Sequence, residues 1–134
     1  MNEAGPGSGA LAERAEAIES AYEFMLAYAA QGRQGNEGGT AGEVRGYLER
    51  LDAALEGLGA ACRAAAQASR EPLDIDGFVE VLDQDAAKAR AAVRLVLSKT
   101  AISSLLVDNL NASIHLRALL TDLFVIDQAL AADQ

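Results

Sequence analysis

The chain has 134 residues and a mass of 13.9 kDa, the size of one domain, and 51% of it is hydrophobic, which is enough for a core. Its 20 acidic and 11 basic residues give a net charge of −9 at pH 7, which excludes a surface built to neutralise nucleic-acid phosphates and disfavours docking on an anionic membrane. One cysteine and one histidine exclude a disulfide framework, a multi-cysteine zinc site and any site that needs two imidazoles from one chain.

The composition predicts an all-α fold. Alanine supplies 29 of the 134 residues and aromatic residues only 4%, and alanine, leucine, glutamate and arginine are strong helix formers. The first ten residues lack the basic and apolar regions of a signal peptide, and no stretch reaches the roughly 20 uncharged apolar residues that a membrane span needs. We therefore expect a protein of the cytoplasm.

Two glycine-rich segments are predicted to be flexible. Residues 1–9 are MNEAGPGSG, and residues 31–42 contain five glycines among twelve residues. Glycine raises the conformational entropy that folding must overcome, so we expect a disordered segment at 1–9 and a mobile loop at 31–42. The remaining chain, residues 10–134, is predicted to form one helical-bundle domain.

The first helix is predicted from about residue 11 to residue 29, where apolar residues recur at steps of three and four. Tyr22 and Phe24 are two positions apart and therefore point in directions about 200° apart on a helix. We expect one of these rings, together with Met25 or Leu26, to lie outside the core. A helix with apolar residues on two faces indicates a surface for a partner.

The second and third helices follow with the same apolar period. The second is predicted over residues 44–65 without interruption, with Cys62 as a small core residue on its apolar side. Pro72 disfavours a helical conformation for the residue before it and so separates the two helices. The third is predicted over residues 76–96, with Asp76 as its N-cap.

The fourth helix is predicted to begin at Ser98 or Thr100 and to run to about Leu130. No glycine or proline forces a turn at this junction, but a single helix from Asp76 to Leu130 would exceed 50 residues, against an average of about 10–14 in globular proteins. We therefore expect a tight turn or a sharp kink near Ser98–Thr100. A continuous helix would have to bury its exposed apolar half against a second subunit.

These elements predict an antiparallel four-helix bundle of up-down topology, in which a long kinked C-terminal helix could complete a dimer. The fourth helix carries more apolar residues than the roughly 100° sector that one core covers. These residues are Ile102, Leu105, Leu106, Val107, Leu110, Ile114, Leu116, Leu119, Leu120, Leu123, Phe124, Val125 and Ile126. Burial against another copy predicts a homodimer or a subunit of a complex, and the alternative is a central position of this helix in one bundle.

A polar stripe is the strongest candidate site in the sequence. Its residues recur at spacings of 4, 3, 4 and 7, which places them along one side of a continuous helix: Ser104, Asp108, Asn111, His115 and Asp122. The plainest interpretation is a solvated strip, and the alternatives are a buried hydrogen-bonded network or a ligand or metal site. A di-iron carboxylate site is excluded because it needs a Glu-x-x-His pair on each of two helices.

His115 could also accept a phosphoryl group, because histidine phosphotransfer domains resemble this chain in size, acidity and helicity. Those domains place a lysine three residues and a glycine four residues after the histidine. In this chain the two positions are Ala118 and Leu119, so the resemblance does not extend to the motif.

No motif points to catalysis, and we expect no enzyme activity, no cofactor, no nucleic-acid partner and no membrane partner. Our first hypothesis is a non-catalytic helical bundle that acts through protein–protein association, as a self-assembling subunit, an adaptor or a small chaperone. The second is a ligand- or metal-binding bundle that uses the polar stripe, and the third is a phosphorelay intermediate at His115.

Overall fold

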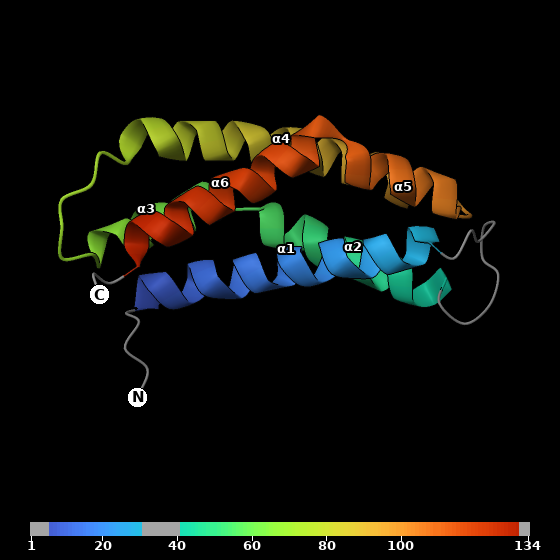
Figure 1. Cartoon of the computed structure of the whole chain (residues 1–134), viewed down its shortest axis with the longest axis horizontal. Helices are drawn as coiled ribbons and strands as arrows, with labels where there is room; N and C mark the ends of the chain where they lie inside the picture. The colour runs from blue at the N-terminus through green and yellow to red at the C-terminus, as the bar shows by residue number, and fades with distance from the viewer. Residues whose placement is uncertain (1–5, 31–40, 132–134) are drawn as a thin grey trace.

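The computed structural model describes residues 6–30 and 41–131, and in these ranges the chain is all-helical (Figure 1). The helices are α1 (Pro6–Ala30), α2 (Ala41–Leu55), α3 (Leu58–Gln67), α4 (Asp76–Leu97), α5 (Ser104–Ala112) and α6 (Ile114–Leu130). The all-α prediction is confirmed for this part of the chain. None of the helices described is both long and apolar enough to cross a membrane.

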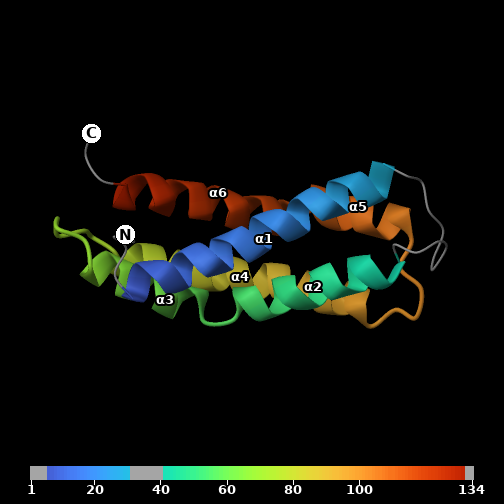
Figure 2. The ribbon, with the colours of Figure 1, turned by 90° about the horizontal axis from the view of Figure 1, so that it is seen from below.

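The helices lie side by side along the long axis of an elongated molecule (Figures 1 and 2). Helix α1 packs on α2, α3 and α5, whereas α4 packs on α2, α3 and α6. One continuous apolar cluster fills the interior, and its largest fully buried side chains include Tyr28, Ile18, Met25, Leu48 and Leu51. Each helix contributes an apolar face to this cluster, as the sequence period predicts.

Cys62 lies in this core, as expected from its apolar neighbours. Burial raises the pKa of its thiol, and the nearby Asp83 carboxylate raises it further, while the charge of Arg63 lowers it. Since the thiolate is the reactive form, the raised pKa makes this cysteine a packing residue.

Ion pairs connect α2 to α4 beside the core. Asp52 accepts hydrogen bonds from Nε of Arg90 at 2.8 Å and from Nε of Arg94 at 3.1 Å, and Arg90 also reaches Glu56. Partial burial alone raises the pKa of Asp52, but the hydrogen bonds and charges of the two arginines outweigh it and hold the pKa below its ordinary value. The pairing therefore favours the charged carboxylate between the helices.

The second predicted helix is broken in two, which the apolar period did not reveal. Helix α2 ends at Leu55 and α3 begins at Leu58, with Gly57 at a φ of 73° between them. Two side chains from other helices hold this break. Arg14 of α1 donates to the carbonyl of Glu56 at 3.2 Å, and Asp83 of α4 accepts from the backbone N–H of Gly59 at 2.9 Å.

Gly57→Ala is expected to lower the free energy of unfolding by about 1–2 kcal/mol, because a side chain disfavours the left-handed conformation that this residue adopts. Gly77→Ala is the matched control, since its added Cβ meets nothing within 4 Å on α4 and its φ is not in that region. The control should leave stability unchanged or raise it by up to about 1 kcal/mol. Urea denaturation measures both, and equal effects would contradict the role given to Gly57.

The fourth predicted helix is also broken, at Ser113. This residue has φ −63° and ψ 138°, and its hydroxyl accepts a hydrogen bond from the backbone N–H of Leu116. It ends α5 and caps α6 at once, because a serine hydroxyl satisfies an N–H group that the first turn of a helix leaves unpaired. The prediction of one helix to Leu130 is therefore wrong. A serine between helix-forming residues is a typical N-cap, so the sequence did contain a signal for the start of α6 at this position.

The turn predicted near Ser98–Thr100 is confirmed, since α4 ends at Leu97 and α5 begins at Ser104. Its details differ from the prediction, because the residue that caps the next helix is Ser103, whose hydroxyl accepts from the backbone N–H of Leu106 at 3.2 Å. Arg45 of α2 holds this turn. Its guanidinium donates to three backbone carbonyl oxygens, those of Leu97, Lys99 and Thr100.

Three other boundaries differ from the sequence prediction. Asp76 is the first residue of α4 and pairs with Arg63, whereas the N-cap position is Ile75 without a side-chain hydrogen bond. Helix α1 begins at Pro6, inside the segment 1–9, of which residues 1–5 lie outside the described residues. The loop predicted over 31–42 falls mostly on residues 31–40, which also lie outside the described residues. The last two residues of the predicted loop belong to α2.

Candidate functional site

The polar stripe of the sequence does not form one continuous surface, because the break at Ser113 divides it. Ser104 and Asn111 of α5 are buried, while Asp108 of α5 and His115 of α6 are exposed. Asp122 is half-buried and faces α4. Over residues 6–30 and 41–131, no group of three or more histidine, cysteine or acidic side chains could hold a metal ion.

Two members of the stripe contain buried polar atoms without a hydrogen-bond partner. These atoms are Oδ1 and Nδ2 of Asn111 and Oδ2 of Asp122. A buried polar atom without a partner costs about 1–3 kcal/mol, so both residues reduce the stability of the fold. Neither residue lines the groove between α1 and α6 that is described below.

Asp122 lies against Asp85 of α4, a contact that no spacing in the sequence predicts. Burial raises the pKa of Asp122, and the hydrogen bond and negative charge of Asp85 raise it further, to about 7. The raised pKa means that the protonated carboxyl group of Asp122 is favoured against α4 up to about pH 7. The sequence could not show this pair, because the relative rotation of two helices is fixed only by their packing.

A groove of about 530 Å³ lies between α1 and α6. It forms because α6 packs on α4, whereas α1 packs on α2, α3 and α5 without close packing against α6. Figure 2 shows α1 beside α5 at one end of the molecule and diverging from α6 toward the other. The groove is lined by Glu19, Tyr22, Glu23, Leu26, Arg117, Leu120, Thr121 and Phe124.

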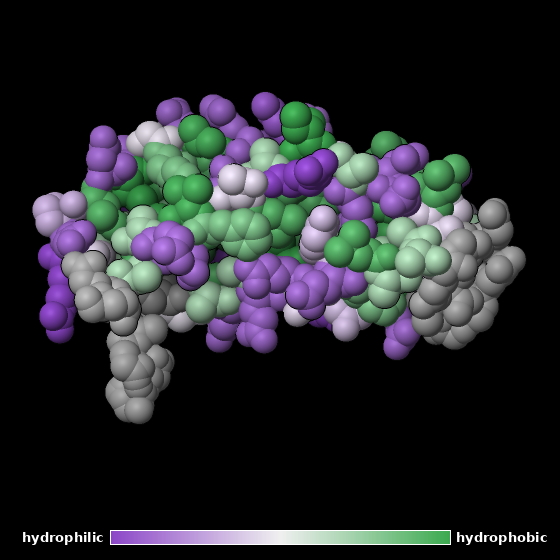
Figure 3. All heavy atoms as spheres, in the orientation of Figure 1, coloured by the Kyte–Doolittle hydropathy of each residue, from purple (hydrophilic) through white to green (hydrophobic). Residues whose placement is uncertain are grey.

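Both helices contribute apolar side chains to the groove. Leu26 of α1 is 48% exposed and Phe124 of α6 is 56% exposed, although both are large hydrophobic side chains. Tyr22 is half-buried and Leu120 is buried at the base. Figure 3 shows hydrophobic side chains over the α1–α6 face, interrupted and bordered by hydrophilic ones.

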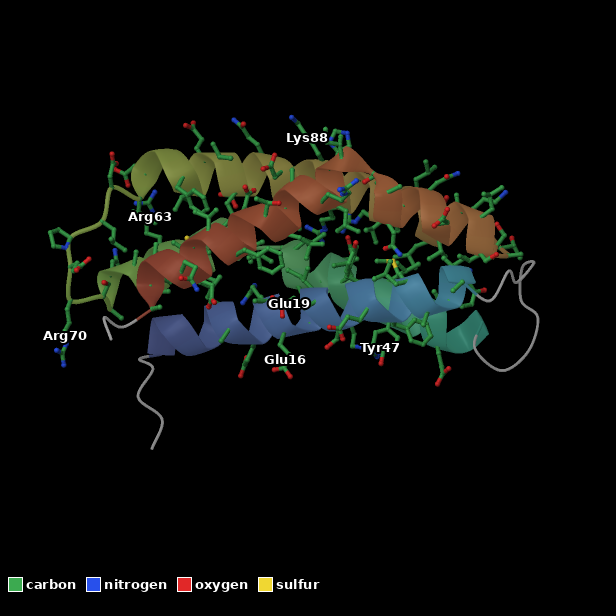
Figure 4. All side chains as sticks on the ribbon, in the orientation of Figure 1. Glu16, Glu19, Tyr47, Arg63, Arg70 and Lys88 are labelled. Atoms are coloured by element: carbon green, nitrogen blue, oxygen red, sulfur yellow. The ribbon has the colours of Figure 1, made fainter. Side chains whose placement is uncertain are left out.

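The two walls carry opposite charges. Glu19 and Glu23 stand on α1, and Arg117 stands on α6. Figure 4 shows Glu19 at the edge of α1 that faces α6, and Glu16 at the opposite edge. In the described part of the chain, none of the three groove side chains makes an ion pair or a side-chain hydrogen bond.

No protein family, no curated protein and no solved structure matches this chain. The sequence predicted part of the groove, since Met25 or Leu26 was expected outside the core and Phe124 belonged to the apolar excess of the fourth helix. Leu26 is the exposed one of the two and Met25 is buried, whereas the rings of Tyr22 and Phe24 are both partly buried against the core. The sequence did not identify the charged walls, because Glu19, Glu23 and Arg117 look like ordinary solvated residues until α1 and α6 are placed side by side.

Proposed function

We propose that this protein is a non-catalytic helical bundle that acts through protein–protein association, with self-assembly into a homodimer as its basic form. In this proposal the chain is an up-down bundle of four antiparallel rods, of which the second comprises α2 and α3 and the fourth comprises α5 and α6. The observation that carries the proposal is the apolar lining of the α1–α6 groove, where Leu26 and Phe124 remain exposed after folding.

The energetics of the groove favour a partner. Burying a leucine or phenylalanine side chain stabilises by about 1.5–3 kcal/mol, so a chain placed over Leu26 and Phe124 gains from both. The groove is open along one side and flanked by two helices, which suits an elongated partner surface.

The charge of the groove favours a second copy as the partner. Its two glutamates and one arginine sum to −1, whereas the whole chain carries −9. Two copies can therefore approach through this face with little of the repulsion that their net charge produces elsewhere. A two-fold dimer uses the same patch on both subunits, which a surface with both signs of charge can satisfy.

Phe124→Glu is expected to weaken self-association by about a hundredfold or more, because each dimer loses two buried aromatic rings and gains two buried charges. Sedimentation equilibrium at micromolar concentration measures the effect against a wild type near twice the 13.9 kDa chain mass. Leu95→Glu is the matched control, since Leu95 is 69% exposed on α4 and lies outside the groove. A monomeric wild type that binds no hydrophobic dye would contradict the proposal.

The ligand-site and phosphorelay hypotheses stay predictions. The residues of the polar stripe are divided between two helices, and His115 is exposed without a side-chain contact to any described residue. No observation favours either hypothesis over association through the α1–α6 groove.

A further inference from the structure

This inference rests on the proposed homodimer and specifies how its two copies meet. We propose that α1 of each copy faces α6 of the other, so that Arg117 of one copy pairs with Glu19 and Glu23 of the second copy. The α1–α6 groove is then the dimer interface, and its charged walls set the orientation of the two subunits.

Arg117 differs from the other arginines of the fold. Six of the eight described arginines contact a carboxylate, a backbone carbonyl or an aromatic ring: Arg14, Arg45, Arg50, Arg63, Arg90 and Arg94. Arg70, in the connection between α3 and α4, and Arg117 are the two without such a contact among the described residues. Only Arg117 of these two lies on the wall of an apolar groove.

Two identical grooves can meet across a two-fold axis in different orientations. If α1 faced α1 of the other copy, the glutamates of both copies would meet, and if α6 faced α6, the two Arg117 side chains would meet. Like charges placed together at an interface disfavour such an orientation. Only the arrangement with α1 facing α6 brings the acidic wall of each copy to the basic wall of the other.

The same arrangement accounts for the apolar residues of the groove. Leu26 stands on α1 and Phe124 on α6, so the groove of each copy covers exposed apolar side chains of the other. The two-fold axis repeats each of these contacts once. The charged residues then border an apolar contact, as in typical protein interfaces.

A charge exchange tests the arrangement. Arg117→Glu alone, and Glu19→Arg with Glu23→Arg, should each raise the dimer dissociation constant at least about tenfold at low ionic strength, because each creates like-charge contacts at both ends of the interface. The triple variant that combines all three substitutions should restore the dissociation constant to within about threefold of wild type. The restoration should weaken as salt screens the pairs.

Two matched substitutions control for net charge. Lys88→Glu changes the charge as Arg117→Glu does, but Lys88 is on α4 and points away from the groove; Glu16→Arg changes the charge on α1 as Glu19→Arg does, at the opposite edge of the helix (Figure 4). Both should leave the dissociation constant within about twofold of wild type. All substituted residues are exposed, so circular dichroism should show the same helix content and melting temperature in every variant.

The outcomes separate this inference from the proposed function. A wild-type dimer that keeps its dissociation constant in Arg117→Glu, or that is not restored in the triple variant, would overturn the arrangement and leave the homodimer intact. A wild type that sediments as a monomer would overturn the homodimer itself.

Discussion

Leu51→Ala is expected to lower the free energy of unfolding by about 2–5 kcal/mol, the largest effect of any single substitution considered for this protein. Leu51 is fully buried on α2 among the side chains of the continuous core, and its truncation would leave a cavity that packed helices cannot fill. Leu55 is 3% exposed and should behave in the same way. Urea denaturation monitored by circular dichroism measures both effects.

The matched control for this prediction is a polar position on a solvated helix face. Glu13→Ala and Glu16→Ala should change stability by no more than about 0.5 kcal/mol, because both side chains are exposed on α1 and make no ion pair or side-chain hydrogen bond with another described residue. Similar losses at leucine and glutamate positions would mean that the apolar stripe does not face the core.

Asp122→Asn is expected to remove a loss of stability that the wild type suffers as pH rises. The pKa of Asp122 is about 7 in the folded chain and 3.8 when unperturbed, so between these values the folded chain holds a proton that the unfolded chain has released. The contribution of Asp122 to the free energy of unfolding is therefore most favourable below about pH 4. It falls as the pH rises from there to about 7 and stays lowered above that pH. Since water screens a half-buried group, we expect a fall of about 1–2 kcal/mol.

The measurement is the free energy of unfolding of wild type and variant from pH 5 to pH 8. Asp122→Asn should be more stable than wild type at pH 8, and Asp85→Asn should have a smaller effect in the same direction, because burial of Asp122 is the larger cause of its raised pKa. Asp127→Asn is the control, since Asp127 is exposed on the same helix. Parallel pH profiles for wild type and Asp122→Asn would show that the pKa of Asp122 is not raised.

Much of the secondary structure was predictable because the apolar period of a helix is a local property of the sequence. The helices near residues 11–29 and 76–96, and the turn after Leu97, follow from this period and from the length that a globular helix can reach. The breaks at Gly57 and Ser113 were missed because the apolar residues continue through both of them. In each case a single residue with special backbone or capping chemistry ends the helix, and the contacts that stabilise the break come partly from other helices.

The candidate site was less predictable for a physical reason. A polar stripe on one helix is a local pattern, whereas the α1–α6 groove and the Asp85–Asp122 pair each depend on how two helices far apart in sequence are rotated toward each other. The excess of apolar residues in the fourth predicted helix did indicate that some of them lie outside the core, because Leu105, Ile114, Phe124 and Val125 are exposed. The sequence did not show that Glu19, Glu23 and Arg117 lie beside exposed apolar residues in one groove.

The irregular points of the fold have a consequence for how the chain folds. Helices α3 and α5 have 10 and 9 residues, which is shorter than the roughly 12–15 residues that an isolated helix needs even for marginal stability in water. Some of the bonds at or near their ends come from distant partners, namely Asp83 to Gly59 and the hydroxyl of Tyr28 to the carbonyl of Ile102 at 2.8 Å. These short helices gain their stability only once α1 and α4 have docked, so local helix formation and long-range assembly are coupled into one cooperative transition.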